Sequence, residues 1–108
     1  MNFEGKVAVI TGSSAGIGAE AAKKISALGG KVTINYSKSK EAAEEVAHEC
    51  SHLGESPLII KADIATDEGC KHLIDRAFSE FGAINILLNN AGRTKFADHS
   101  NLDALQRD

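Results

Sequence analysis

The fold is decided by the stretch Thr11-Gly12-Ser13-Ser14-Ala15-Gly16-Ile17-Gly18, which follows an apolar run and opens an alanine-rich helical pattern. The apolar run, Val7-Ala8-Val9-Ile10, is typical of a parallel strand that is covered on both faces. A strand, a glycine-rich turn and a helix N-terminus in this order form a cradle for a phosphate. The glycines let the backbone approach an anion, and the first helical N–H groups point at it. We therefore predict an anion-binding turn at residues 11–18.

The rest of the chain alternates between helical and strand patterns. Strands are predicted at 6–10, 32–36, 58–62 and 84–88, and helices at 16–28, 39–54 and 66–82. This alternation predicts right-handed crossovers and a parallel α/β sheet with strand order 3-2-1-4, in which the third helix lies on the opposite face from the first two. Apolar spacing predicts the buried helix faces: Ile17, Ala21, Ile25 and Leu28; Ala42, Ala43, Val46, Cys50 and Leu53; Cys70, Leu73, Ile74, Ala77, Phe78 and Phe81.

Composition excludes several classes of function. The 108 residues are 43% apolar and 25% charged, which is typical of one globular domain. A net charge of −3 provides no basic surface for nucleic acid or anionic lipid. No apolar run approaches the ~20 residues that span a membrane, and the first six residues lack a signal-peptide pattern. Cys50 and Cys70 fall on apolar helix faces, so we expect reduced thiols and a cytoplasmic protein.

Three polar signatures each come directly after a predicted strand. They are Gly12–Gly18, Asp63 and Asn89-Asn90-Ala91-Gly92. Ligands of parallel α/β sheets bind at the carboxyl ends of the strands, so we expect the three signatures to contribute to one site. A P-loop is excluded, since no Lys-Ser/Thr pair follows the last glycine.

Thr11-Gly-x-x-x-Gly-Ile-Gly18, together with Asn89-Asn-Ala-Gly92, resembles the classical short-chain dehydrogenase/reductase family. The resemblance covers nearly the whole chain and implies the N-terminal half of a doubly wound Rossmann fold that binds NAD(P). It also implies cofactor-binding roles for Gly12, Ser14, Gly16, Ile17 and Gly18 near the pyrophosphate, for Tyr36, Ser37 and Lys38 after the second strand, for Asp63 and Ile64 at the adenine, and for Asn89, Ala91 and Gly92 on the nicotinamide side. Asp63 alone would also fit a turn before a helix.

The end of the second strand bears on the choice of cofactor. A carboxylate there holds the ribose 2′-hydroxyl of NAD, whereas a basic residue favours the 2′-phosphate of NADP. The segment Asn35-Tyr36-Ser37-Lys38-Ser39-Lys40 has no acidic residue, so NADP(H) is favoured over NAD(H). Two observations weigh against this preference. Ala15 replaces an arginine that NADP-preferring relatives often carry, and the two lysines also fit a solvated stretch before a helix.

The resemblance implies oxidoreduction of a carbonyl/alcohol pair of a small molecule. The family's chemistry uses a tyrosine, a lysine, a serine and an asparagine downstream of the matched region. The single tyrosine of this chain, Tyr36, is wrongly placed, and no Tyr-x-x-x-Lys spacing occurs, so no catalytic residue is assigned and the 108 residues alone are expected to be inactive. Residues 93–108 read as the start of a further helical segment, so we expect a truncated domain, with homo-oligomers possible in a full-length form.

Two other readings remain. A non-catalytic nucleotide-binding or interaction module is the main alternative, and such a module should end in a capped helix or a covered edge strand. His48-Glu49-x-x-His52 fits a zinc-protease pattern, but both histidines point away from the predicted apolar face of their helix, so no metal site is predicted.

Overall fold

The computed structural model describes residues 2–90 of the chain. Strands and helices alternate in the order β1 (Val7–Thr11), α1 (Gly16–Ala27), β2 (Lys31–Tyr36), α2 (Lys40–Leu53), β3 (Leu58–Lys61), α3 (Asp67–Phe81) and β4 (Ile86–Asn89). The predicted elements are all present. The last strand begins two residues later than predicted, because Asn85 turns its side chain to the sheet and accepts a 2.8 Å hydrogen bond from the Val7 N–H.

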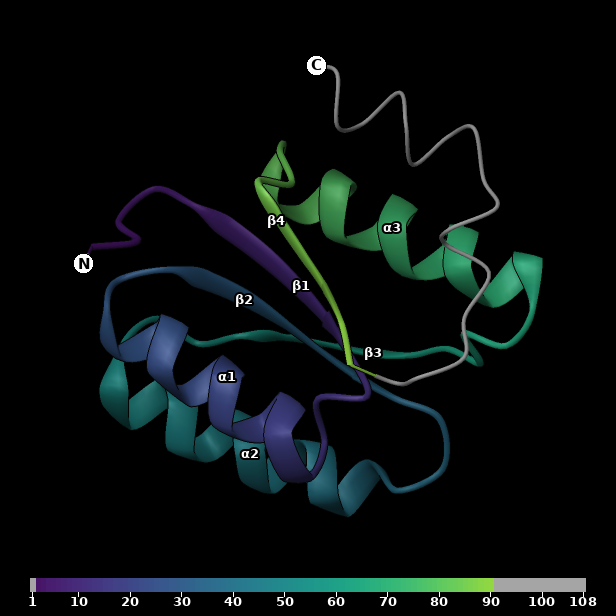
Figure 1. Cartoon of the computed structure of the whole chain (residues 1–108), viewed down its shortest axis with the longest axis horizontal. Helices are drawn as coiled ribbons and strands as arrows, with labels where there is room; N and C mark the ends of the chain where they lie inside the picture. The colour runs from purple at the N-terminus through teal and green to yellow at the C-terminus, as the bar shows by residue number, and fades with distance from the viewer. Residues whose placement is uncertain (1, 91–108) are drawn as a thin grey trace.

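The four strands form one parallel sheet of order β3-β2-β1-β4, as predicted (Figure 1). β1 lies in the centre and pairs with β2 through Ile10 and Ile34 and with β4 through Thr11 and Asn89. Since all strands run in one direction, their carboxyl ends gather at one edge of the sheet. In the part of the chain that is described, β3 and β4 are the edge strands.

Helices cover both faces of the sheet (Figure 1). α1 and α2 pack on one face over a cluster that includes Ile10, Ile34 and Val46. α3 lies on the other face over a smaller cluster that includes Val9, Ile60 and Leu73. The three-layer arrangement is the one predicted from the right-handed crossovers.

Local signals set the helix ends. Ser39 caps α2 by accepting from the Ala42 N–H at 3.2 Å, and Thr66 caps α3 by accepting from the Gly69 N–H at 2.9 Å. Gly82 ends α3 in the left-handed conformation, with φ +77°. These caps confirm the predicted starts of the second and third helices.

The predicted buried face of α1 is partly wrong. Ile17 is 80% exposed and Leu28 is 39% exposed, whereas Gly18, Ala19, Ala22, Ile25 and Ser26 are buried. The helix packs through its small residues, which allow a close approach to the sheet and to α2. The prediction from apolar spacing favoured the large side chains and therefore placed the buried face of α1 incorrectly.

Smaller corrections apply to the other helices. In α2, Leu53 is 49% exposed and Ala47 is buried in its place. In α3, Cys70, Leu73 and Ala77 are buried as predicted, but Phe78 is 46% exposed. Both cysteines are buried and, within residues 2–90, neither forms a disulfide, as expected. Between residues 2 and 90, no helix is both long enough and apolar enough to cross a bilayer.

Candidate functional site

The glycine-rich turn leads from the carboxyl end of β1 into α1. Gly12 and Gly16 both have φ +60°, a conformation that L side chains rarely adopt. The first residue of α1 is Gly16. Its N-cap, Ala15, offers no side-chain hydrogen bond, and the first turn contains no acidic residue. The first N–H groups of α1 are therefore left for an anion, and no acidic side chain in the first turn opposes one.

Asn35 fixes this turn from the neighbouring strand. Its side-chain Oδ1 accepts from the Gly12 N–H at 3.0 Å, and its backbone carbonyl accepts from the Ser13 N–H at 3.1 Å. The hydroxyl of Ser13 accepts from the Asn35 N–H at 2.8 Å and donates to the Ile10 carbonyl at 2.7 Å. Both residues are almost fully buried. Three hydrogen bonds thus tie the turn to Asn35 of β2, and a fourth ties it to Ile10 of β1.

The amide nitrogen of Asn35 also reaches β3. It lies 3.4 Å from the Ile60 carbonyl and 3.3 Å from the Ala62 carbonyl, both of which can accept its hydrogens. One side chain therefore links the turn after β1 to β2 and to the end of β3. The sequence prediction missed this role, although a polar residue inside the apolar strand Val32–Tyr36 was a signal for it.

Thr11 links the carboxyl ends of β1 and β4. Its hydroxyl accepts from the Asn90 N–H at 2.9 Å and lies 3.2 Å from the side-chain oxygen of Asn89. The side-chain amide of Asn90 donates to the Gly12 carbonyl at 3.2 Å. The predicted signature at residues 12–18 is therefore in direct contact with Asn90 of the predicted signature at residues 89–92.

Gly18 lies where these two segments meet. A Cβ atom added there would be 2.6 Å from Asn90 Nδ2, 2.7 Å from the Gly12 carbonyl oxygen and 3.0 Å from Ser13 Cα. Two of the three neighbours are backbone atoms, which cannot move aside easily. Only glycine fits at this position, because of close packing rather than backbone conformation.

The ends of β2 and β3 contribute the remaining predicted residues. Ser37 and Lys38 are exposed directly after β2, whereas Tyr36 is only 9% exposed and its side chain belongs to the core under α1 and α2. Asp63 is exposed, and its Oδ1 accepts a hydrogen bond from the Ala65 N–H at 3.0 Å. This bond fits the alternative prediction for Asp63, a turn residue before the third helix. Ile64 is 7% exposed and packs with the core beneath α3.

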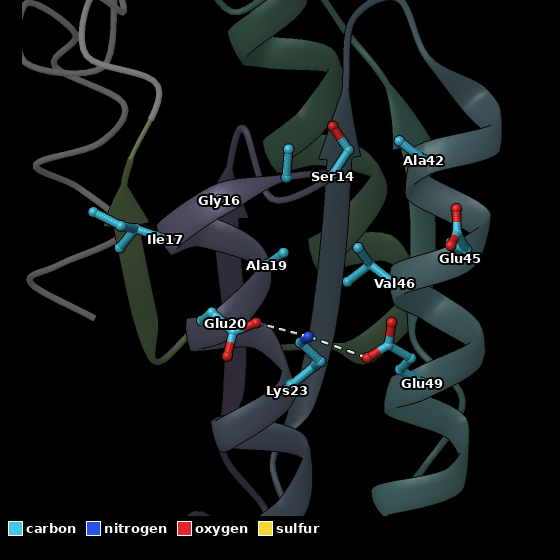
Figure 2. Close-up of a pocket in the computed structure, with 11 residues that line it drawn as sticks. Ser14, Gly16, Ile17, Ala19, Glu20, Lys23, Ala42, Glu45, Val46 and Glu49 are labelled. Carbon is cyan, nitrogen blue, oxygen red and sulfur yellow. Dashed lines mark hydrogen bonds and ion pairs between the residues drawn. The ribbon is translucent and has the colours of Figure 1, made fainter.

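A groove of about 550 Å³ runs between α1 and α2 and is open beside the glycine-rich turn (Figure 2). Lys23 lies between two carboxylates, 2.7 Å from Glu20 and 3.1 Å from Glu49. The hydrogen bond from Lys23 lowers the pKa of Glu20, and the bonds to Glu20 and Glu49 raise the pKa of Lys23. Glu20 and Lys23 therefore stay charged near neutral pH, and the ion pair between Lys23 and Glu49 joins α1 to α2.

A second cavity, of about 200 Å³, lies on the opposite side of α1, between that helix and the end of β4. Its lining includes Ile17, Gly18, Leu88 and Asn89. Ile17 points away from α2 in Figure 2, toward β4. The exposed Ile17 thus belongs to the wall of this apolar cavity, which adjoins the carboxyl edge of the sheet.

The structure places the predicted residues from 12 to 90 along one edge of the sheet. Ser14 lines the groove, Gly16 and Ile17 begin α1, and Gly18 contacts Asn90. The side chains of Tyr36 and Ile64 face the core instead of the edge. Ala91 and Gly92 lie outside the described residues. Asn35 is a positioning residue outside the predicted signatures. Ser13, Thr11 and Asn90 lie in the predicted motifs, but the sequence prediction gave them no positioning role.

The sequence matches a family described as short chain dehydrogenase over residues 6–107. Among curated relatives, the versicolorin reductase of Emericella nidulans is 40% identical over 94 residues, which are 87% of this chain and 36% of that protein. The chain therefore spans little more than a third of the length of the curated relatives it matches.

Solved structures agree with this match. A short chain dehydrogenase from Burkholderia cenocepacia in complex with NADP is 41% identical, with a TM-score of 0.80 over 85% of this chain and 38% of that one. The 3-ketoacyl-(acyl-carrier-protein) reductase from Brucella melitensis, complexed with NADH, is 39% identical, with a TM-score of 0.69 over 78% of this chain and 33% of that one. Both share the strand and helix arrangement described above.

Proposed function

Since this chain belongs to the short chain dehydrogenase family, we propose that it holds a nicotinamide dinucleotide at the carboxyl edge of its sheet. The cofactor would serve the oxidoreduction of a carbonyl/alcohol pair of a small molecule. The nicotinamide ring supplies hydride transfer when it is bound, and the protein supplies binding and orientation. This chain covers about a third of the length of the relatives it matches. The choice of substrate and the complete set of catalytic residues therefore belong to the whole protein.

The hydrogen-bonded turn after β1 carries this proposal. Asn35 and Ser13 hold the backbone of residues 12–13, and Asn90 holds the Gly12 carbonyl from the other side. Because this turn is already ordered, an anion can bind at the N-terminus of α1 with little further loss of conformational entropy. We place the pyrophosphate against Gly12, Ser14 and the first turn of α1, residues 16–18.

The adenosine end would lie along the ends of β2 and β3. Lys38 is exposed, and no carboxylate stands between Tyr36 and Glu41. The Lys38 ammonium and the Ser37 hydroxyl would bind a 2′-phosphate, so we propose that NADP(H) is preferred over NAD(H). Asp63 is exposed beside this segment and would meet the adenine. The side chains of Tyr36 and Ile64 are buried, so these residues would contribute to the cofactor site through their backbone and by packing in the core beneath it.

The nicotinamide end would lie beside β4. Thr11 fixes the backbone of Asn90, and the cavity lined by Ile17 and Leu88 provides an apolar wall nearby. We assign Asn89, Ala91 and Gly92 to this end of the cofactor. The 108 residues contain a single tyrosine, Tyr36, which is buried in the core. We therefore propose that these 108 residues bind the cofactor without turning over substrate. A non-catalytic binding module is the alternative function for the chain alone.

Calorimetric titration of the 108-residue chain with NADPH and with NADH tests the proposal. We expect NADPH to bind more tightly, and the Lys38→Asp variant to lose about tenfold or more in NADPH affinity while its NADH affinity is unchanged or improved. Lys6→Asp is the matched control, because it makes the same charge change at an exposed position at the opposite, amino edge of the sheet. Absence of binding for both dinucleotides contradicts the proposed function, and equal affinities contradict the NADP preference alone.

A further inference from the structure

Two histidines lie one helical turn apart on the exposed face of α2. The Nε2 atoms of His48 and His52 are 3.1 Å apart, and the rings meet edge to face with their centroids separated by 4.5 Å. Both residues are exposed, as the sequence predicted. In this arrangement one Nε2 donates a hydrogen to the other, and a metal ion that replaces this hydrogen would lie within reach of both nitrogens.

The distance between the two nitrogens matches the spacing of two ligands on one metal ion. Imidazole nitrogens bind such ions at about 2.0–2.1 Å, and two ligands separated by 90–110° around the ion then lie about 2.8–3.4 Å apart. The 3.1 Å separation falls inside this range. We propose that His48 and His52 form a two-imidazole chelate for a divalent late first-row transition metal ion. This site is separate from the dinucleotide site and departs from the prediction that the chain binds no metal.

The remaining ligands would be water. Residues 2–90 contain no cluster of three or more histidine, cysteine or acidic side chains that is able to hold a metal. Glu49, the residue that would act as base in a zinc protease, is instead paired with Lys23 of α1 at 3.1 Å (Figure 2). Two nitrogens with water ligands suit the tetragonal geometry of Cu²⁺ or Ni²⁺ better than a closed tetrahedral zinc site. We therefore expect Cu²⁺ to bind most tightly.

The electrostatic surroundings also favour a cation. His52 is in the last turn of α2, where the negative end of the helix dipole stabilises positive charge. The helix sequence contains four glutamates and one lysine. The chelate needs no rearrangement of the backbone, because a helix already places residues i and i+4 on one face.

Titration of the 108-residue chain with Cu²⁺, followed by electron paramagnetic resonance in a non-coordinating buffer, tests this proposal. We expect one equivalent of Cu²⁺ to show two coordinated imidazole nitrogens. His48→Asn and His52→Asn should each lose one nitrogen and weaken binding about tenfold or more. Ni²⁺ should bind at the same residues and should raise the melting temperature of the native chain, since it binds the folded helix.

His72→Asn is the matched control, because it removes an exposed histidine from α3, on the other face of the sheet. This variant should keep the affinity and the two-nitrogen signal. Circular dichroism of each variant without metal shows whether it is folded, and we expect no change at these exposed positions. The proposal is overturned if either single variant of the pair binds Cu²⁺ as tightly as the native chain, or if the native signal contains only one imidazole nitrogen.

Discussion

The backbone N–H of Gly12 donates a 3.0 Å hydrogen bond to the side-chain oxygen of Asn35, a residue 23 positions later in the chain. This bond sets the path of the glycine-rich turn from the neighbouring strand. The same side chain reaches the carbonyls of Ile60 and Ala62 beyond it. One buried amide therefore ties together the ends of β1, β2 and β3 at the edge of the sheet that would bind the cofactor.

Replacement of Asn35 by alanine should destabilise the chain and weaken dinucleotide binding. The substitution leaves the Gly12 N–H without its side-chain partner and removes the amide that donates to the Ile60 and Ala62 carbonyls, and the expected loss is about 3 kcal/mol in the free energy of unfolding. Urea denaturation measures this loss, and calorimetry measures the affinity. Asn85→Ala is the control: its side chain accepts from the Val7 N–H at the amino edge of the sheet, so about 1 kcal/mol should be lost with no change in affinity. Equal effects of the two variants on affinity would contradict the assigned role.

Introduction of a methyl group at Gly18 should disrupt the turn. The Cβ of Gly18→Ala would lie 2.7 Å from the Gly12 carbonyl oxygen, so the turn or the helix must shift, at about 1–3 kcal/mol. We expect NADPH affinity to fall about tenfold or more, since the shift moves the N–H groups that face the anion. Gly82→Ala provides the comparison, because it strains the left-handed end of α3, costing about 1 kcal/mol, without touching the site. An unchanged affinity in Gly18→Ala would show that the close packing does not position the turn.

The same substitution at two buried threonines should have opposite effects. Thr33 is fully buried in β2, and within the described part of the chain its hydroxyl has no hydrogen-bond partner. Thr33→Val removes this unsatisfied group and should raise the free energy of unfolding by about 1 kcal/mol. Thr11→Val should lower it by about 1–2 kcal/mol, because the Thr11 hydroxyl accepts from the Asn90 N–H. Thermal denaturation of both variants is sufficient, and destabilisation by Thr33→Val would reveal a partner for its hydroxyl.

Cys50 should make the stability depend on pH in the alkaline range. Burial raises the pKa of its thiol above the ordinary value of 9.0, so the native state keeps a proton that the unfolded chain loses. The native state then binds more protons than the unfolded state, and the stability falls as the pH rises above about 9. Denaturation at several pH values should show a smaller alkaline decrease in Cys50→Ala than in the native chain. Alkylating reagents should modify Cys50 only after unfolding, and rapid modification of the native thiol would argue against its burial.

Much of the fold could be predicted because its signals are local. These signals depend only on residues that are close together in the sequence. They include the caps at Ser39 and Thr66, the glycine that ends α3 and the apolar strands. Their alternation limits the topology to a few parallel arrangements, and the order β3-β2-β1-β4 is among them. The burial of both cysteines as reduced thiols was likewise expected from their places on the predicted apolar helix faces.

The details of packing were harder to predict. The spacing of Ile17 and Leu28 indicated a buried stripe, but α1 packs through glycine and alanine because its neighbours approach closely. Tyr36 and Ile64 were assigned to the cofactor by their place after strands, whereas their side chains are in the core. Sequence position fixes the edge at which a residue lies, and only the packing fixes the direction of its side chain.

The sequence by itself determined the order of strands and helices, the parallel sheet and the edge where the three polar signatures meet. Those features follow from periodicity, caps and chirality, which operate along the chain. The tertiary structure alone decided that Asn35 holds Gly12, that Gly18 contacts Asn90 and that Thr11 joins β1 to β4. These contacts join residues that are 23 to 79 positions apart in the chain, and a buried polar group finds its partner only when the strands that carry both groups are side by side.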